Sequence, residues 1–214
     1  MDVTVATESA GGVRRTLDRV GQAALLGWAI VRVLPRPRVY VTATLQQAYV
    51  MGIRSLPLVL IMAVLGGAVT AQQTGNQFTG GMPLWVIGAV VAAGVLTELG
   101  PMLTGIVLVG RVGASIAAEL AAMRVTEQID ALEAMGRDPV AILVVPRVVA
   151  GLLVVPPLVV LADLAGILAG WGSGMLLVDG MTSADFLYGM RYYFRPVSLV
   201  YSVLKGAVFG VTIT

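Results

Sequence analysis

The sequence has no cysteine, no histidine and few charged residues. Without cysteine and histidine the chain can form no disulfide, offers no thiol nucleophile, and cannot hold zinc or haem through these side chains. Charged residues make up 12% of the 214 residues, against about 25% in an average soluble protein. We therefore expect no metal site and no cofactor bound by this chain.

Apolar residues dominate instead. They make up 57% of the chain, and the mean hydropathy is +0.90. A helix needs about 20 apolar residues to cross a bilayer, and several runs reach that length. The sequence predicts an all-α, polytopic helical membrane protein with about four transmembrane segments, in one domain (14–214) after a disordered tail (1–13). The spans are expected at residues 56–74, 84–109, 140–178 and 196–214.

Two mixed helices are expected before the first span, at residues 14–34 and 39–54. A signal peptide is the alternative for the first of them, because Arg14 and Arg15 precede an apolar run. Arginines and prolines at 32–38 nevertheless stand where a small-residue cleavage site would be needed. This pattern favours an N-terminal helix lying in the membrane interface.

The arginines predict the orientation of the chain. Seven precede the first span, four lie between Arg111 and Arg147, and two, Arg191 and Arg195, lie in an amphipathic, aromatic segment at 179–195. Because arginine accumulates in cytoplasmic loops, the N-terminus and the segment between the second and third spans are expected in the cytoplasm. The arginines form no basic stripe with aromatic residues, so no nucleic-acid partner is expected.

A polar segment, residues 98–146, interrupts the apolar chain and includes a short helix. Thr126 is expected as its N-cap and Glu127 in its first turn, where the helix dipole favours an acid. Gly136 is expected to take a left-handed conformation at its end, before Pro139. Helical spacing puts Gln128, Ile129, Leu132 and Met135 on one side, and Glu127, Asp130 and Glu133, with Ala131 and Ala134, on the other. The pattern is typical of a docking helix; an amphipathic loop helix resting on lipid headgroups is the alternative.

Several blocks of sequence carry a resemblance to a known family. Asp130-Ala131-Leu132-x-x-x-Gly136 resembles the E-A-A-x-x-x-G loop with which bacterial ABC-importer permeases dock onto their ATPase. Residues from about Pro35 onward resemble the MlaE/YrbE permeases of MCE-type lipid transporters. The blocks are Glu98-Leu99-Gly100-Pro101, Gly110-Arg111-Val112-Gly113, Ala118-Glu119, Met123-Arg124-Val125-Thr126-Glu127-Gln128, Asp138-Pro139 and Pro146-Arg147.

The resemblance implies a permease subunit for phospholipid or another lipid in the bacterial inner membrane. It implies a second permease copy (identical or a paralogue), a cytoplasmic ABC ATPase that binds ATP and Mg²⁺, an MCE-domain protein, and in some systems a STAS-domain protein. It assigns residues 126–136 to the ATPase contact. It assigns the lipid path to Gln73, Thr97, Glu98, Leu99 and Pro101. The family continues with one more span, so the chain is expected to be C-terminally incomplete.

Charged residues within the spans need partners, because a bare charge in the bilayer costs a few kcal/mol. Glu98 is expected to face a dimer interface, a wet cavity or a partner; the alternative is a buried hydrogen bond that shapes the Gly100-Pro101 kink. Thr97 stands where the family often has arginine. Asp163 is expected to pair with Lys205, with a proton relay as the alternative, and Arg111 with Glu119 or an acid of the short helix.

Two other function classes compete with a permease. An intramembrane lipid-modifying enzyme would use Glu98 and Asp163 as acid and base, but the sequence has no clustered carboxylate motif. A secondary transporter would need internal inverted repeats, which the sequence lacks. No phosphate-binding G-x-x-x-x-G-K-[ST] loop occurs, so ATP hydrolysis is expected on a partner. The stripe of Gly166, Gly170 and Gly174 predicts close helix packing within the chain.

Overall fold

The computed structural model describes residues 21, 25, 27–33, 40–77 and 83–214. The predicted tail at 1–13 and most of the predicted helix at 14–34 lie outside the described residues. Of that helix, residues 27–33 are helical. The interfacial placement of the N-terminal helices stays a prediction.

The part of the chain that the structure describes is built from α-helices and contains no strand. The helices are α2 (Val41–Gly52), α3 (Leu56–Gln77), α4 (Trp85–Gly94), α5 (Gly100–Leu108), α6 (Ala114–Val125), α7 (Gln128–Ala134), α8 (Val145–Leu177), α9 (Ser183–Tyr193) and α10 (Pro196–Ile213). Three π-helical turns continue the helices between them: η2 (Val95–Leu99), η3 (Val109–Gly113) and η4 (Val140–Val144). The predicted all-α class is confirmed.

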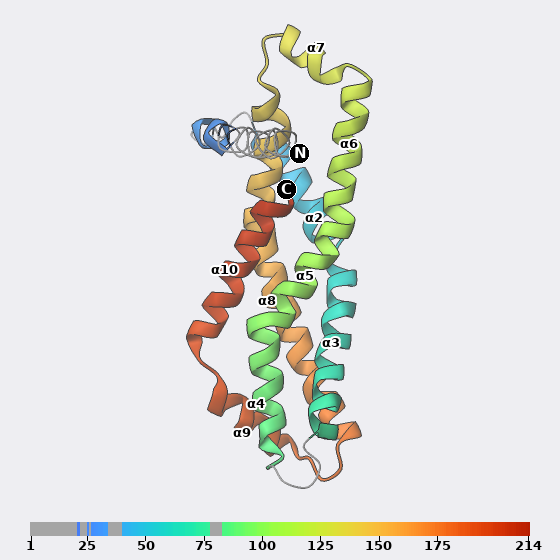
Figure 1. Cartoon of the computed structure of the whole chain (residues 1–214), viewed down its shortest axis with the longest axis vertical. Helices are drawn as coiled ribbons and strands as arrows, with labels where there is room; N and C mark the ends of the chain where they lie inside the picture. Colours follow the sequence, from blue (N-terminus) through green and yellow to red (C-terminus); the bar gives the residue numbers. More distant parts are fainter. Residues whose placement is uncertain (1–20, 22–24, 26, 34–39, 78–82) are drawn as a thin grey trace, which may run out of the picture.

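Four helical stretches are long and apolar enough to cross a membrane, and they confirm the prediction of a polytopic membrane protein. They are Val41–Gln77, Trp85–Val125, Val140–Leu177 and Pro196–Ile213. The helix of the second span continues beyond residue 109, the predicted end of that span. The π-turns η2 and η3 keep the chain helical, so that α4, α5 and α6 follow one another in one stretch of 41 residues. The first half of the polar segment therefore extends a membrane helix, toward the end of the molecule that carries α7 (Figure 1).

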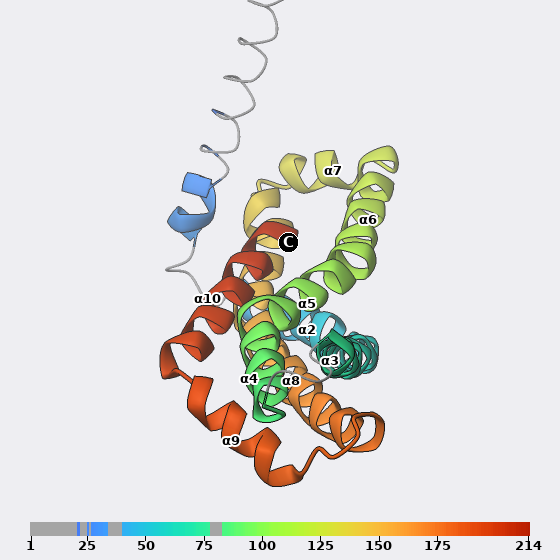
Figure 2. The ribbon, with the colours of Figure 1, turned by 60° about the horizontal axis from the view of Figure 1, so that its bottom comes forward.

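Helix α8 lies at the centre of the bundle, in contact with α2, α3, α5 and α10 (Figure 2). The larger apolar core joins these helices and includes Met51, Val59, Leu108 and Val159, all buried. A smaller core, around Phe186, packs α9 against α4 near the other end. Burial is therefore concentrated along α8, and α7 contains no buried residue.

Glycines allow α3 and α8 to touch through their backbones. A Cβ at Gly67 would overlap the carbonyl of Gly166, and one at Gly170 would lie 3.1 Å from the carbonyl oxygen of Gly67 and press on Val91 of α4. Small residues spaced by four permit such contacts in membrane helices. The predicted packing role of the glycine stripe within the chain is confirmed.

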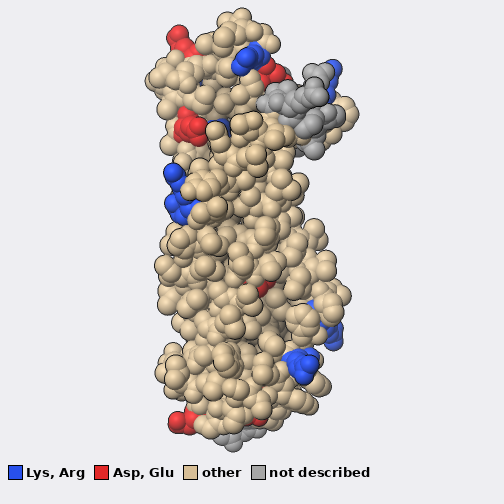
Figure 3. Space-filling view, turned by 180° about the vertical axis from the view of Figure 1, so that it is seen from behind, with Lys and Arg blue, Asp and Glu red and all other residues tan. Residues whose placement is uncertain are grey.

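Aromatic residues gather at the end opposite α7. Trp85 at the start of α4 meets the rings of Tyr188 and Tyr192 on α9, with centroids 5.8 and 5.3 Å away. Thr182 caps α9 in a capping box with Asp185. Tryptophan and tyrosine favour the membrane interface, and the cluster has the composition expected there. On the face seen in Figure 3, most charged side chains lie toward the two ends, and the broad band between them shows little charge apart from a small acidic patch.

Candidate functional site

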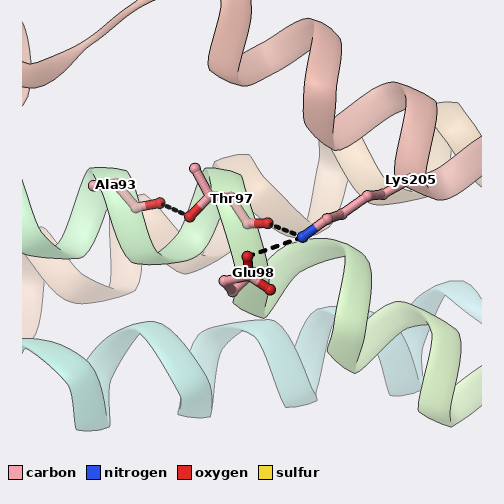
Figure 4. Close-up of polar contacts among 4 residues, drawn as sticks. All are labelled: Ala93, Thr97, Glu98 and Lys205. Atoms are coloured by element: carbon pink, nitrogen blue, oxygen red, sulfur yellow. Dashed lines mark hydrogen bonds and ion pairs between the residues drawn. The ribbon is translucent and has the colours of Figure 1, made fainter.

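An ion pair lies about a third of the way along the Trp85–Val125 helix, and a proline creates part of its geometry. An α-helix would pair the carbonyl of Thr97 with the N–H of residue 101, but Pro101 has none. Lys205 Nζ donates to this carbonyl at 2.7 Å and to Glu98 Oε1 at 2.9 Å, as Figure 4 shows. Thr97 and Glu98 thus bind the single lysine of the chain through two oxygens.

The ion pair borders a cavity of about 410 Å³ between α5 and α10. Its other lining residues are Met102, Tyr201, Leu204, Val208 and Phe209. Lys205 also lies over the Tyr201 ring, 4.6 Å from its centroid. The side chain of Glu98 is 65% exposed and that of Lys205 is 26% exposed. A charge pair this open, at mid-helix, requires water, a polar ligand or another subunit against it.

The predicted pair between Asp163 and Lys205 is wrong. Asp163 is 4% exposed, and its Oδ2 accepts a hydrogen bond of 2.6 Å from Ser202 Oγ. Its Oδ1 fills the space that the missing side chain of Gly100 leaves, and has no donor among the described residues. The carboxylate is held one helical turn away from Lys205, because Ser202 precedes the lysine by three residues on α10. Glu98 and Asp163 therefore have separate partners.

The residues predicted for the lipid path do not all meet. Thr97 and Glu98 lie at the ion pair, where Thr97 Oγ1 donates to the Ala93 carbonyl at 2.8 Å. Pro101 is buried, and Leu99 packs on the smaller core. Gln73 lines a different, open cavity of about 360 Å³ at the C-terminal end of α3. Sequence reasoning missed Tyr201, whose spacing of four from Lys205 was the available signal.

The short helix of the polar segment differs from its prediction at the start and agrees at the end. Helix α6 runs on to Val125, so Thr126 lies at its C-terminus and Thr126 Oγ1 donates to the Ala122 carbonyl at 2.8 Å. Thr126 is therefore not the N-cap of α7. Glu127 takes that position in a left-handed conformation, φ 55°. Gly136 has φ 70°, as predicted for the residue that ends the helix.

Helix α7 presents most of its surface to solvent. Only Ile129 and Leu132 are partly buried, whereas Gln128 and Met135, expected on the same side, are exposed. Glu127, Asp130 and Glu133 are exposed, as are Ala131 and Ala134. Helix α7 therefore presents an acidic surface to solvent, and a small apolar strip of Ile129 and Leu132 is its partly buried side.

The predicted pair between Arg111 and Glu119 is also wrong. Eight residues separate them on one helix, which is about 12 Å of rise. Arg111 Nη1 instead donates to the backbone carbonyl of Arg54, next to the break between α2 and α3. Glu119 pairs with Arg147 at the start of α8, with 2.9 Å between Oε2 and Nη2. Arg147 is 3% exposed, and its Nε and Nη1 have no acceptor among the described residues.

Comparison with known proteins identifies the family. A family model described as Permease MlaE matches residues 44–214. A probable ABC transporter permease protein of Rickettsia felis is 38% identical over 195 residues, which cover 91% of this chain and 75% of the relative. The intermembrane phospholipid transport system permease protein MlaE of Haemophilus influenzae is 30% identical over 201 residues (91% and 75%). The chloroplastic protein TRIGALACTOSYLDIACYLGLYCEROL 1 of Arabidopsis thaliana is 33% identical over 193 residues (89% and 54%).

These matches cover nearly all of the described bundle, including the ion pair and α7, and confirm the resemblance seen in the sequence blocks. They indicate a transporter subunit rather than a catalytic enzyme. The chain belongs to the MlaE permease family and is a multi-pass membrane protein of that family.

Proposed function

We propose that this chain is the membrane permease of an ATP-driven phospholipid transporter. The name of the Haemophilus relative supports phospholipid as the substrate class, and the names of the Rickettsia relatives support an ABC system. Two copies, identical or paralogous, would form the membrane part. ATP and Mg²⁺ would bind to a partner ATPase, and an MCE-domain protein, in some systems with a STAS-domain protein, would complete the assembly.

The observation that carries the proposal is the single helical stretch from Trp85 to Val125. It bears Glu98 about a third of the way along and leads, through one left-handed residue, into the exposed acidic α7. A force applied to α7 reaches α6 directly, because α7 packs on that helix. The same stretch can then change the geometry at Glu98, Lys205 and the adjoining cavity.

The cavity beside the ion pair suits a phospholipid in part. Its apolar walls match acyl chains, while the carboxylate and the ammonium group can bind the two charged parts of a headgroup. In the dimer proposed here, a second copy would cover the open side of Glu98. Gln73 would lie farther along the path, toward the aromatic end, and Leu99 beside Glu98.

The arginine bias supports an orientation with α7 and the N-terminus in the cytoplasm, as expected for the bacterial inner membrane. In that orientation α7 meets a cytoplasmic ATPase, and Trp85 and α9 face the opposite side, where an MCE-domain protein would bind. The orientation can be measured by introducing single cysteines into this cysteine-free chain and labelling them with a membrane-impermeant thiol reagent.

Charge reversal on α7 tests the coupling. Asp130→Lys with Glu133→Lys is expected to abolish co-purification of the ATPase and to lower lipid-stimulated ATP hydrolysis at least tenfold. Asp179→Lys, at an exposed position near the other end, is the control and should leave both unchanged. The melting temperature of the permease should not change in either variant, because α7 has no buried residue. Full ATPase binding and hydrolysis in the double variant would refute the coupling role.

A further inference from the structure

A second cavity, of about 410 Å³, lies between α2 and the start of α6, far from the ion pair along the Trp85–Val125 helix. Six of its nine lining residues are polar: Gln46, Gln47, Arg54, Arg111, Ser115 and Glu119. Buried Val112 and Ile116 form an apolar part of the wall. The transport path proposed above does not use this cavity.

The cavity carries an excess of positive charge. The guanidinium of Arg54 has no hydrogen-bond or ion-pair partner within the described ranges, and that of Arg111 is oriented by its bond to the Arg54 carbonyl. The opposing charge of Glu119 is matched by Arg147 at 2.9 Å. Two guanidinium groups beside amide and hydroxyl donors are the side chains that bind phosphate oxygens, because several N–H groups can converge on one anion.

The position of the cavity along the membrane normal favours a lipid over a protein partner. Trp85 marks one membrane interface, and Arg111 follows it by about 26 residues, or about 39 Å of helix. A bilayer with its headgroups is about 40–45 Å thick, so Arg111 lies at headgroup level in the other leaflet. Arg54 immediately precedes α3, whose 22 residues span about 33 Å, and so lies at the same level. Helix α7 begins about 43 residues after Trp85, beyond the headgroups.

We propose that this cavity is a binding site for the phosphate of a membrane phospholipid in the leaflet nearer α7. Arg54 and Arg111 bind the phosphate oxygens, and Gln46, Gln47 and Ser115 donate further hydrogen bonds. Glu119 accepts from a hydroxyl or ammonium group at the end of the headgroup. A lipid held here would brace the break between α2 and α3 against the base of α6.

Native mass spectrometry of the delipidated full-length chain tests the site. The chain is titrated with a palmitoyl-oleoyl phosphatidylglycerol, with the diacylglycerol that has the same acyl chains, and with inorganic phosphate. We expect one high-affinity phosphatidylglycerol, whose Kd rises at least tenfold in Arg54→Gln with Arg111→Gln. Ser115→Trp, which fills the cavity without changing charge, should have the same effect. Arg124→Gln with Arg137→Gln removes the same charge from exposed positions near α7 and should change the Kd less than twofold.

Four outcomes would overturn the assignment. Equal binding of diacylglycerol would show that the phosphate is not recognised. Competition by inorganic phosphate at the lipid's own concentration would indicate a soluble anion instead of a lipid. An equal loss of lipid affinity in the Arg124 and Arg137 control variant would show that binding depends only on the net charge of the chain. Unchanged lipid binding with loss of ATPase co-purification in the Arg54 and Arg111 variant would assign the cavity to a protein partner.

Discussion

Two regions of the molecule differ in how tightly they pack. One is the contact between α3 and α8, here called the seam; the other is the arch formed by α6, α7 and the start of α8. At the seam, Gly67 and Gly166 bring two backbones into contact, with no room for a side chain. In the arch, α7 has no buried residue, and the base is fastened by the pair of Glu119 and Arg147. The seam determines how the bundle packs, whereas the arch leaves its side chains free for a partner.

Breaking the seam should have the largest effect. Gly67→Val places two methyl groups where the carbonyl of Gly166 lies, and neither backbone can move away without separating α3 from α8. We expect a loss of about 3 kcal/mol or more, seen as loss of the monodisperse peak in size-exclusion chromatography. Gly172→Val, on α8 with open space around it, is the matched control and should elute as wild type. A well-folded Gly67→Val protein would show that the seam is not close-packed.

The two residues of the ion pair at the base of the arch should differ in how much stability is lost when each is replaced. Glu119→Ala leaves the buried guanidinium of Arg147 without its carboxylate, which should lower stability by about 1–3 kcal/mol, less than for a fully buried pair because Glu119 is half-exposed. Arg147→Met leaves Glu119 in contact with solvent and fills the buried space, so its loss should be below about 1 kcal/mol. Thermal unfolding in detergent measures both. Equal losses, or a larger loss for Arg147→Met, would contradict the asymmetry.

The sequence predicts these two regions unequally well. The helices, the glycine contact and the left-handed Gly136 follow from apolar length, spacing by four and backbone preference, all of which are local or periodic. The predicted start of α7 was wrong. The preceding helix continues through the π-turns to Val125, so Thr126 lies at the end of that helix.

The pairing of charges was the least predictable part of the candidate site. Hydropathy identifies Glu98, Asp163 and Lys205 as groups in need of partners, but three groups permit more than one pairing. The choice depends on Pro101, which frees the Thr97 carbonyl for Lys205, and on Gly100, which makes room for Asp163. Both effects act between residues about 60 to 110 positions apart in sequence, and only the assembled bundle reveals them.

Removal of the membrane ion pair should affect transport more than stability. Glu98→Gln removes the opposite charge of Lys205 but leaves the lysine bound to the Thr97 carbonyl and over Tyr201, so the melting temperature should fall less than in Glu119→Ala. Transport of fluorescent phospholipid by the reconstituted assembly should fall at least tenfold. Glu98→Gln with Lys205→Met should restore stability and not transport. Recovery of transport in the double variant would show that the pair only balances charge.

The smallest effect should come from the end of α7. Gly136 has φ 70° and open space around it, so the cost of a side chain arises from the backbone alone. Gly136→Ala is expected to cost about 1 kcal/mol, and Gly136→Asn less, because asparagine tolerates the left-handed conformation better. The loss should be local to α7: hydrogen exchange should quicken at residues 128–135, while the seam between α3 and α8 keeps its protection. Faster exchange at both regions would mean that the arch and the seam unfold as one unit, and the contrast between them would not hold.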